Sequence, residues 1–213
     1  MSLITLTDPR SPVSEAYRTL RTNLSFYSVD NPIKTLVVTS PTPQENPADT
    51  VANLAVTLAQ SGRRTLLVDC DLRRPALHAA FSLPAEPGLT NMVLNEVDKL
   101  PIQNTSVDNL ALLASGPTPP NPADLIGSRQ FDRILEAVQA EYDIILFNAP
   151  PILAVTDATI LGAKVDGVLL VVSAGKTRRD HAERAKEILE KAHVRIVGAT
   201  LTNAPKDDSV GSY

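Results

Sequence analysis

The fold of this chain is decided by residues 34–60, which read KTLVVTSPTPQENPADTVANLAVTLAQ. Residues 34–40 have the apolar centre of a buried strand, and residues 48–60 have the spacing of an amphipathic helix that Gly62 closes. The residues between them form a tight loop. A strand, a loop and a helix in this order are typical of a phosphate-binding loop, in which backbone N–H groups and the helix N-terminus hold the phosphate.

The chemistry usual in such a loop is missing from residues 41–49, PTPQENPAD. A phosphate-binding loop uses Gly for close approach, a Lys for the β- and γ-phosphate oxygens, and a Ser or Thr hydroxyl for Mg²⁺. This loop has no Gly and no Lys, and no hydroxyl stands where the metal ligand is expected. The sequence therefore predicts the frame of a nucleotide site without its usual ligands.

Length and composition indicate one α/β domain without a disulfide framework. The 213 residues suffice for a single large core, and we expect that domain at 1–203, followed by a flexible tail at 204–213. A net charge of -4 argues against nucleic-acid binding, and the single Cys70 suits a reducing cytoplasm. No apolar run approaches the roughly 20 residues of a membrane span. We therefore expect no direct membrane insertion and a cytoplasmic location, at the inner face of a membrane only through a partner.

Apolar runs alternate with helical patterns along the chain, which predicts a parallel sheet. Further strands are expected at 64–71, 110–114, 144–148, 167–173 and 196–201, and helices from Ser11, within 75–94, from Asn121, at 128–139 and at 177–192. Residues 1–9 are expected to be a loose lead-in. The helix from Ser11 is expected to bury Ala16, Tyr17, Leu20, Leu24 and Phe26. The predicted fold class is α/β, a doubly wound, mostly parallel sheet with helices on both faces, whose ligands bind at the carboxyl ends of the strands.

The most specific signal is the pair Asp69 and Asp71 in LLVDCDLRRP, residues 66–75. Two carboxylates at i and i+2 at a strand end suit Mg²⁺ and its waters, or can accept a hydroxyl proton. An isolated Asp-x-Asp is more often a strand that ends in polar residues, with the second Asp closing a turn, so the neighbouring motifs must decide. No metal site is predicted from the histidines, which lack ligand spacing with one another or with the cysteine: His78, His181 and His193.

Four motifs in order resemble those of the bacterial tyrosine kinases (BY-kinases) of the capsular exopolysaccharide family, relatives of the deviant-Walker ATPases of the MinD and ParA type. They are the Glu-x-x-Arg-x-x-Arg segment at 15–21, the Walker A loop and helix at 40–55, the second Walker A-type motif at 66–75, and Walker B at 145–150 with Asn148 in place of Asp. The resemblance covers residues 11–203. It implies a P-loop NTPase fold and ATP-dependent phosphorylation of tyrosine.

The resemblance also implies a nucleotide site whose residues depart from the family pattern. Pro47 falls on the phosphate-binding Lys and lacks a backbone N–H, and Ala48 lacks the Mg²⁺-holding hydroxyl. Glu45 and Asp49 add negative charge where polyphosphate would bind, and Asn148 removes a carboxylate. The degenerate nucleotide-binding set is Thr42, Pro43, Gln44, Glu45, Asn46, Pro47, Ala48, Asp49, Asn148 and Asn203. The last of these lies near the place where the family contacts adenine, or is simply an Asn in a turn after a strand.

Two functions follow as alternatives. The first is a pseudokinase of exopolysaccharide or capsule biosynthesis, with impaired ATP binding and phosphoryl transfer, that acts by assembly or regulation; Asp69 and Asp71 would be vestigial and no cofactor is expected. The second is an active protein-tyrosine autokinase that binds ATP or ADP with Mg²⁺ in an altered way through these two residues. A partitioning ATPase is disfavoured by residues 72–75, LRRP, and by the lack of a C-terminal membrane-targeting helix.

The resemblance implies protein partners as well. In the family the Glu-x-x-Arg-x-x-Arg segment builds a ring, so Glu15, Arg18 and Arg21 are candidates for a homo-oligomer contact, although their spacing also suits ion pairs on a solvated helix. BY-kinase domains work with a membrane-spanning polysaccharide co-polymerase whose cytoplasmic tail docks on them. The family's C-terminal tyrosine cluster is reduced here to Tyr213, which is either a phosphosite or a chance residue of a frayed end.

Overall fold

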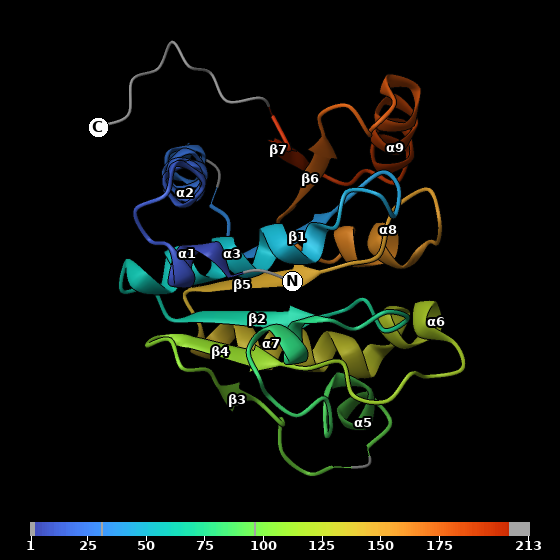
Figure 1. The fold of residues 1–213 in the computed structure, drawn as a ribbon. Helices are drawn as coiled ribbons and strands as arrows, with labels where there is room; N and C mark the ends of the chain where they lie inside the picture. Colours follow the sequence, from blue (N-terminus) through green and yellow to red (C-terminus); the bar gives the residue numbers. More distant parts are fainter. Residues whose placement is uncertain (1–2, 31, 96, 205–213) are drawn as a thin grey trace.

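A seven-stranded sheet forms the centre of the molecule (Figure 1). The structure, a computed structural model, describes residues 3–30, 32–95 and 97–204. The strands lie in the order β3-β4-β2-β5-β1-β6-β7, with the bounds β1 Thr35–Thr39, β2 Thr65–Asp69, β3 Gln103–Asn104, β4 Leu110–Leu113, β5 Ile144–Asn148, β6 Gly167–Ser173 and β7 Ile196–Thr202. Every neighbouring pair is parallel except β3 and β4. The predicted mostly parallel α/β fold is therefore confirmed.

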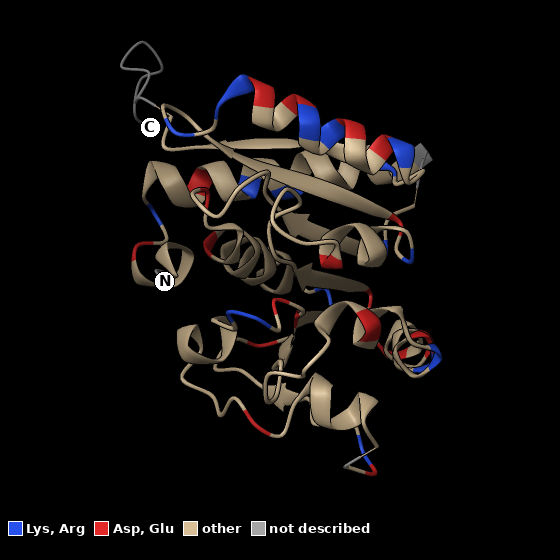
Figure 2. Ribbon diagram, turned by 90° about the vertical axis from the view of Figure 1, so that its right-hand side faces the viewer, with Lys and Arg blue, Asp and Glu red and all other residues tan. Residues whose placement is uncertain are grey.

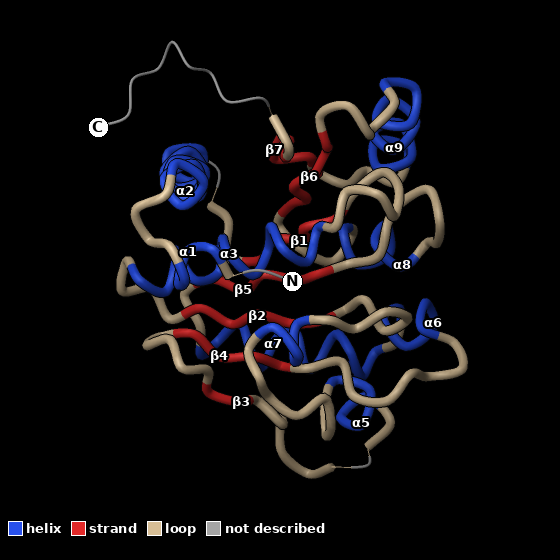
Figure 3. The backbone as a smooth tube through the Cα atoms, viewed as in Figure 1, coloured by secondary structure: helices blue, strands red, loops and turns tan. Residues whose placement is uncertain are grey.

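Helices cover both faces of the sheet (Figure 3). The helices are α1 Ile4–Thr7, α2 Pro12–Asp30, α3 Pro47–Gln60, α4 Leu77–Ala80, α5 Leu89–Val93, α6 Pro122–Gly127, α7 Arg129–Glu141, α8 Asp157–Gly162 and α9 Arg179–Lys191. One face packs against α5 to α9 and the other against α2, α3 and α4, with α1 resting on α2 and α3. Successive strand residues alternate between the two cores: Val37 and Leu66 lie in one, Leu36 and Leu67 in the other. Burial on both faces is why the strand sequences are continuously apolar.

Helix α3 begins where the loop after β1 ends. Asn46 takes the left-handed conformation, with φ 50°, and Pro47 fills the first helical position, where no N–H is needed. The amide Nδ2 of Asn46 donates to the carboxylate of Asp49 at 2.7 Å. From Pro47 to Ala59 nearly every residue of α3 is buried, because the helix lies between the sheet and α2. Helix α3 therefore begins one residue before the predicted range of 48–60 and ends where predicted.

Three short elements were not predicted. Residues 4–7 form α1, whose Thr5 is buried, so the expectation of a loose lead-in is wrong there. Strand β3 has two residues and runs antiparallel to β4, and α8 has six residues after the two prolines that follow β5. Elements of two to six residues are too short for a hydrophobic period to be recognised, which explains why all three were missed.

Helix α2 buries a narrower face than expected. Leu24 is buried, and Tyr17 and Leu20 are half-buried, as predicted. Ala16 is exposed and Phe26 is 72% exposed, so the prediction is wrong for these two. The reason is that α2 packs mainly on α3, another helix, so only a thin stripe of its surface is covered.

Charged side chains follow one another along α9, with both signs interspersed (Figure 2). Arg179 pairs with Glu183 at 2.9 Å and Lys186 pairs with Glu190 at 3.5 Å, both at i,i+4 spacing. Exposed pairs of this kind contribute little to stability, so α9 is a solvated helix that covers the sheet with its other side. In the part of the chain that the structure describes, no helix is long and apolar enough to cross a membrane.

Candidate nucleotide site

The ten predicted nucleotide-site residues gather at one edge of the sheet, at the carboxyl ends of β1, β5 and β7. Pro43 and Gln44 are exposed at the tip of the loop, whereas Pro47 and Ala48 are buried in the first turn of α3. Since β1 and β5 are neighbours and β7 lies two strands from β1, the predicted gathering at the carboxyl edge is observed. Whether these residues bind a nucleotide stays a prediction.

The loop between β1 and α3 closes around the side chain of Glu45. This carboxylate is 4% exposed. It accepts the backbone N–H of Thr42 at 3.0 Å and the Thr42 hydroxyl at 2.9 Å. It also accepts the hydroxyl of Thr177, from the loop between β6 and α9, at 2.8 Å. An anion supplied by the chain itself therefore lies inside the loop.

Asp69, the last residue of β2, is fully buried and engaged on both carboxylate oxygens. Oδ1 accepts the amide Nδ2 of Asn148 at 2.8 Å and the N–H of Asp71 at 3.3 Å. Oδ2 accepts the N–H groups of Ala76 and Leu77, at the start of α4, at 2.9 and 3.0 Å. Burial raises the pKa of Asp69, and these donors act in the opposite direction. Asn148 is 2% exposed, and its Oδ1 accepts no hydrogen bond from the residues that the structure describes.

Asp71 lies beyond the strand end and closes a turn. Its Oδ1 accepts the N–H of Arg74 at 3.0 Å, and burial raises its pKa. Arg73, two residues after Asp71, makes a bidentate pair with the fully buried Asp157 at 3.0 and 3.1 Å. This pair joins the loop after β2 to the start of α8. Sequence reasoning missed it, because no pattern connects two residues that lie 84 positions apart.

Cys70, between the two Asp residues, is not available for chemistry. It is fully buried, and burial raises the pKa of its thiol well above the usual value, with the neighbouring carboxylates acting in the same direction. The thiolate is the reactive form of cysteine, so this thiol is inert at neutral pH. In the described ranges, no group of three His, Cys, Asp or Glu side chains is placed to hold a metal ion.

Hydrogen bonds continue from Glu45 across the ends of β6 and β7. The Thr177 hydroxyl that donates to Glu45 accepts the backbone N–H of Ser173 at 2.7 Å. The Ser173 hydroxyl in turn accepts Nδ2 of Asn203 at 2.8 Å. Asn203 follows β7 in the left-handed conformation, with φ 53°. Asn203 thus lies in a bend after the strand, and a contact with adenine stays a prediction. Sequence reasoning did not find Thr177, which this network joins to the predicted set.

The first turns of α3 are tied to α1 and α2. Oδ1 of Asn53 accepts the N–H and the hydroxyl of Thr5 at 3.1 and 2.9 Å. Tyr17 of α2 hydrogen-bonds Thr50, and burial raises the pKa of the tyrosine. The candidate site and the helix that carries the Glu-x-x-Arg-x-x-Arg segment are thus one packed unit.

The predicted assembly residues have partners within the chain. Arg18 pairs with Glu15 at 2.7 Å and donates to the carbonyl of Pro9 at 2.6 Å. Arg21 donates to the carbonyl of Thr57 at 3.0 Å and so fastens α2 to α3. The Arg18–Glu15 pair is the ion pair of the solvated-helix alternative, whereas Arg21 makes a contact between helices that was not predicted. A contact between subunits stays a prediction for all three residues. Tyr213 lies outside the described residues.

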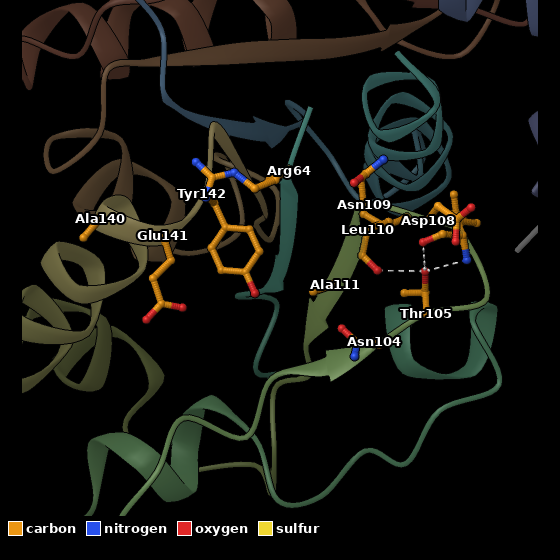
Figure 4. A pocket seen from close by; sticks show the side chains of 11 residues that line it. Arg64, Asn104, Thr105, Asp108, Asn109, Leu110, Ala111, Ala140, Glu141 and Tyr142 are labelled. Carbon is orange, nitrogen blue, oxygen red and sulfur yellow. Dashed lines mark hydrogen bonds between the residues drawn. The ribbon is translucent and has the colours of Figure 1, made fainter. Parts of the chain in front are cut away.

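A cavity of about 690 Å³ lies at the opposite, amino edge of the sheet (Figure 4). It is lined by Arg64, Asn104, Thr105, Val107, Asp108, Asn109, Leu110, Ala111, Ala140, Glu141 and Tyr142. Arg64 at its rim pairs with Asp143 at 2.7 Å. The described residues of the predicted nucleotide site do not line this cavity.

Known proteins that resemble this chain identify its family. A model of the AAA domain family matches residues 48–180. The tyrosine-protein kinase YwqD of Bacillus subtilis is 44% identical over 201 residues, which are 94% of this chain and 85% of that protein. The chain belongs to the BY-kinase family. The structure of the chimerical protein CapA2B2 matches this BY-kinase chain with a TM-score of 0.92 and 36% identity, over 96% of this chain and 90% of that one.

A more distant structure shows the wider fold to which BY-kinases belong. The septum site-determining protein MinD of Pyrococcus horikoshii, complexed with Mg-ADP, has a TM-score of 0.67 and 22% identity. The match covers 79% of this chain and 69% of that one. At this identity the likeness shows the fold alone, which is the predicted P-loop NTPase fold.

Proposed function

We propose that this BY-kinase-family chain is a pseudokinase of exopolysaccharide or capsule biosynthesis, which acts by assembly or regulation. The observation that carries the proposal is the state of Asp69. In metal-assisted phosphoryl transfer a carboxylate at this place must be free for the metal shell or for a proton. Here four protein donors take both of its oxygens, and one of them is the amide of Asn148.

The residues of the loop do not fit Mg-ATP. The N–H of Thr42 is bound by Glu45, and Pro47 has no N–H to offer. No lysine stands between Ser40 and Thr50. Two buried or half-buried carboxylates, Glu45 and Asp49, would meet a polyphosphate with like charge. Since phosphoryl transfer depends almost wholly on positioning and charge stabilisation, these features argue against it here.

In the proposed role the chain acts through protein–protein contacts at its surface. We expect a homo-oligomer to which Glu15, Arg18 and Arg21 contribute, and docking of the cytoplasmic tail of a membrane-spanning polysaccharide co-polymerase. That partner would hold the chain at the inner face of the membrane. Exposed ion pairs contribute only about 0–1 kcal/mol each, so the arginines set the register of such a contact and do not drive it alone.

An active tyrosine autokinase is the second candidate, and the relatives favour it. YwqD, at 44% identity, and CpsD of Streptococcus agalactiae, at 35%, are both named as tyrosine-protein kinases. Asp69 and Asp71 are also retained. Binding of Mg-ATP through these carboxylates would require the hydrogen bonds of Asp69 to be given up.

Titration calorimetry with Mg-ATP and Mg-ADP separates the two candidates. We expect no heat of binding from the wild type at nucleotide concentrations up to millimolar. The variant with Asn46→Gly, Pro47→Lys, Ala48→Thr and Asn148→Asp should gain a dissociation constant of roughly micromolar order, about -8 kcal/mol. The same variant without Pro47→Lys is the matched control and should bind much more weakly. Micromolar binding by the wild type would overturn the pseudokinase proposal.

A further inference from the structure

Five residues form a continuous path of hydrogen bonds across three loops at the carboxyl edge of the sheet. The path runs through Thr42, Glu45, Thr177, Ser173 and Asn203, with no link longer than 3.0 Å. It connects the loop after β1, the loop after β6 and the turn after β7. Its two end residues, Thr42 and Asn203, both belong to the predicted nucleotide-binding set.

A local turn does not account for the position of Glu45. Within its own loop, the Glu45 carboxylate accepts the N–H and the hydroxyl of Thr42, three residues away. Oε1 also accepts the hydroxyl of Thr177, which is 132 positions away in the sequence. A carboxylate that is 4% exposed is costly unless it is hydrogen-bonded, and hydrogen bonds to a charged group are about twice as strong as neutral ones.

We propose that Glu45 is an internal anchor that joins the loop after β1 to the loop after β6 and, through Ser173, to Asn203. Side chains of the chain itself thereby hold these loops together at this edge of the sheet. The inference goes beyond the proposed function, which concerns phosphoryl transfer and not how the loops are held. Glu45 is a positioning residue in this role.

Hydrogen exchange of the ligand-free protein tests the anchor. In the wild type, amides at 42–46 and 173–177 should exchange slowly. Glu45→Ala should speed exchange at 173–177 by about 10- to 100-fold, the loss expected for one charge-assisted hydrogen bond. Gln44→Ala, an exposed neighbour in the same loop, is the control and should leave 173–177 unchanged. Faster exchange at 42–46 alone would overturn the proposal, because Glu45 would then serve only its own loop.

A variant of Thr177, the other partner in the contact, provides a second, independent test of the anchor. Thr177→Val keeps the shape of the side chain and removes the hydroxyl, so it should speed exchange at 42–46. Thr118→Val, at an exposed position, is the matched control. In a double-mutant cycle, Glu45→Ala and Thr177→Val should be coupled by about 5- to 100-fold in the unfolding equilibrium constant. Additive effects would overturn the anchor. Nucleotide binding is measured separately, so failure here is distinct from failure of the pseudokinase proposal.

Discussion

Replacing Asn148 by Asp is expected to destabilise the fold strongly near neutral pH, because it brings two carboxylates into contact inside the sheet. In the wild type, Nδ2 of Asn148 donates to Oδ1 of Asp69 at 2.8 Å, and the two side chains are 2% and 0% exposed. Asn148→Asp removes that donor and adds a like charge. Removing one partner of a buried charge costs about 3–5 kcal/mol, which lowers Tm by roughly 6–20 °C in a domain of this size.

The size of this loss should depend on pH. Burial already raises the pKa of Asp69, and an adjacent carboxyl raises the pKa of both groups further. A carboxyl whose pKa is higher in the folded than in the unfolded state binds an extra proton when folded. Its contribution to stability is therefore complete below the unfolded pKa, about 4, and is lost as pH rises through the folded pKa. The gap in Tm between variant and wild type should be smallest at acid pH and widen toward alkaline pH.

Thermal unfolding followed by circular dichroism across this pH range checks the prediction. Asn109→Asp makes the same change of charge in an exposed loop and should shift stability by no more than about 0.5 kcal/mol. Millimolar Mg²⁺ that restores the Tm of Asn148→Asp would mean that a cation can bridge the new pair. Equal Tm values for Asn148→Asp and wild type at neutral pH would contradict the account of Asp69 given above.

Sequence patterns predicted the central strands of the sheet because β1, β2, β4, β5 and β6 are buried on both faces. Strands β5 and β6 have the predicted bounds, and β1, β2, β4 and β7 lie within or close to the predicted runs. Burial on both faces leaves an apolar run that is visible without any partner information. Strand β3 has two residues, one Gln and one Asn, and owes its conformation to pairing with β4 alone. The two residues of β3 carry no sequence pattern that would predict a strand.

The position of the candidate site was predicted from the sequence, but the hydrogen-bond partners of its side chains were not. Asp69 and Asn148 were expected at the same edge because both end parallel strands, and they are paired there. Glu45 was interpreted as a charge that repels polyphosphate, whereas the structure turns it inward to Thr177. Hydrogen bonds between residues far apart in sequence follow from the tertiary fold and leave no periodic trace. The hydrogen-bond partners of these side chains could therefore be identified only from the structure.

Gly88→Ala is expected to destabilise the fold about as much as Asn148→Asp, because the added methyl group would meet backbone atoms. A Cβ on Gly88 would lie 2.1 Å from the backbone nitrogen of Gly116 and 2.5 Å from the carbonyl oxygen of Ala114. The N–H groups of Leu89 and Thr90 donate at 2.8 Å to the carbonyls of Ala114 and Ser115, so the loop before α5 is held against the end of β4. No rotation of a side chain can relieve this contact. The backbone of Gly88 is extended, so the cost arises from space alone.

We expect Gly88→Ala to cost about 4 kcal/mol or more, a fall in Tm of roughly 8–16 °C. Gly198→Ala in β7 is the matched control, because a Cβ there meets no atom within 4 Å. That change should be close to neutral, or stabilising by about 0.4–1 kcal/mol through a smaller entropy of the unfolded chain. Urea and thermal unfolding of both variants provide the measurement. The contact between Gly88 and residues 114–116 lies directly before the segment that leads into α6. Only Gly88→Ala should therefore also speed hydrogen exchange at 114–118. Faster exchange at 114–118 in Gly198→Ala would contradict the packing described here.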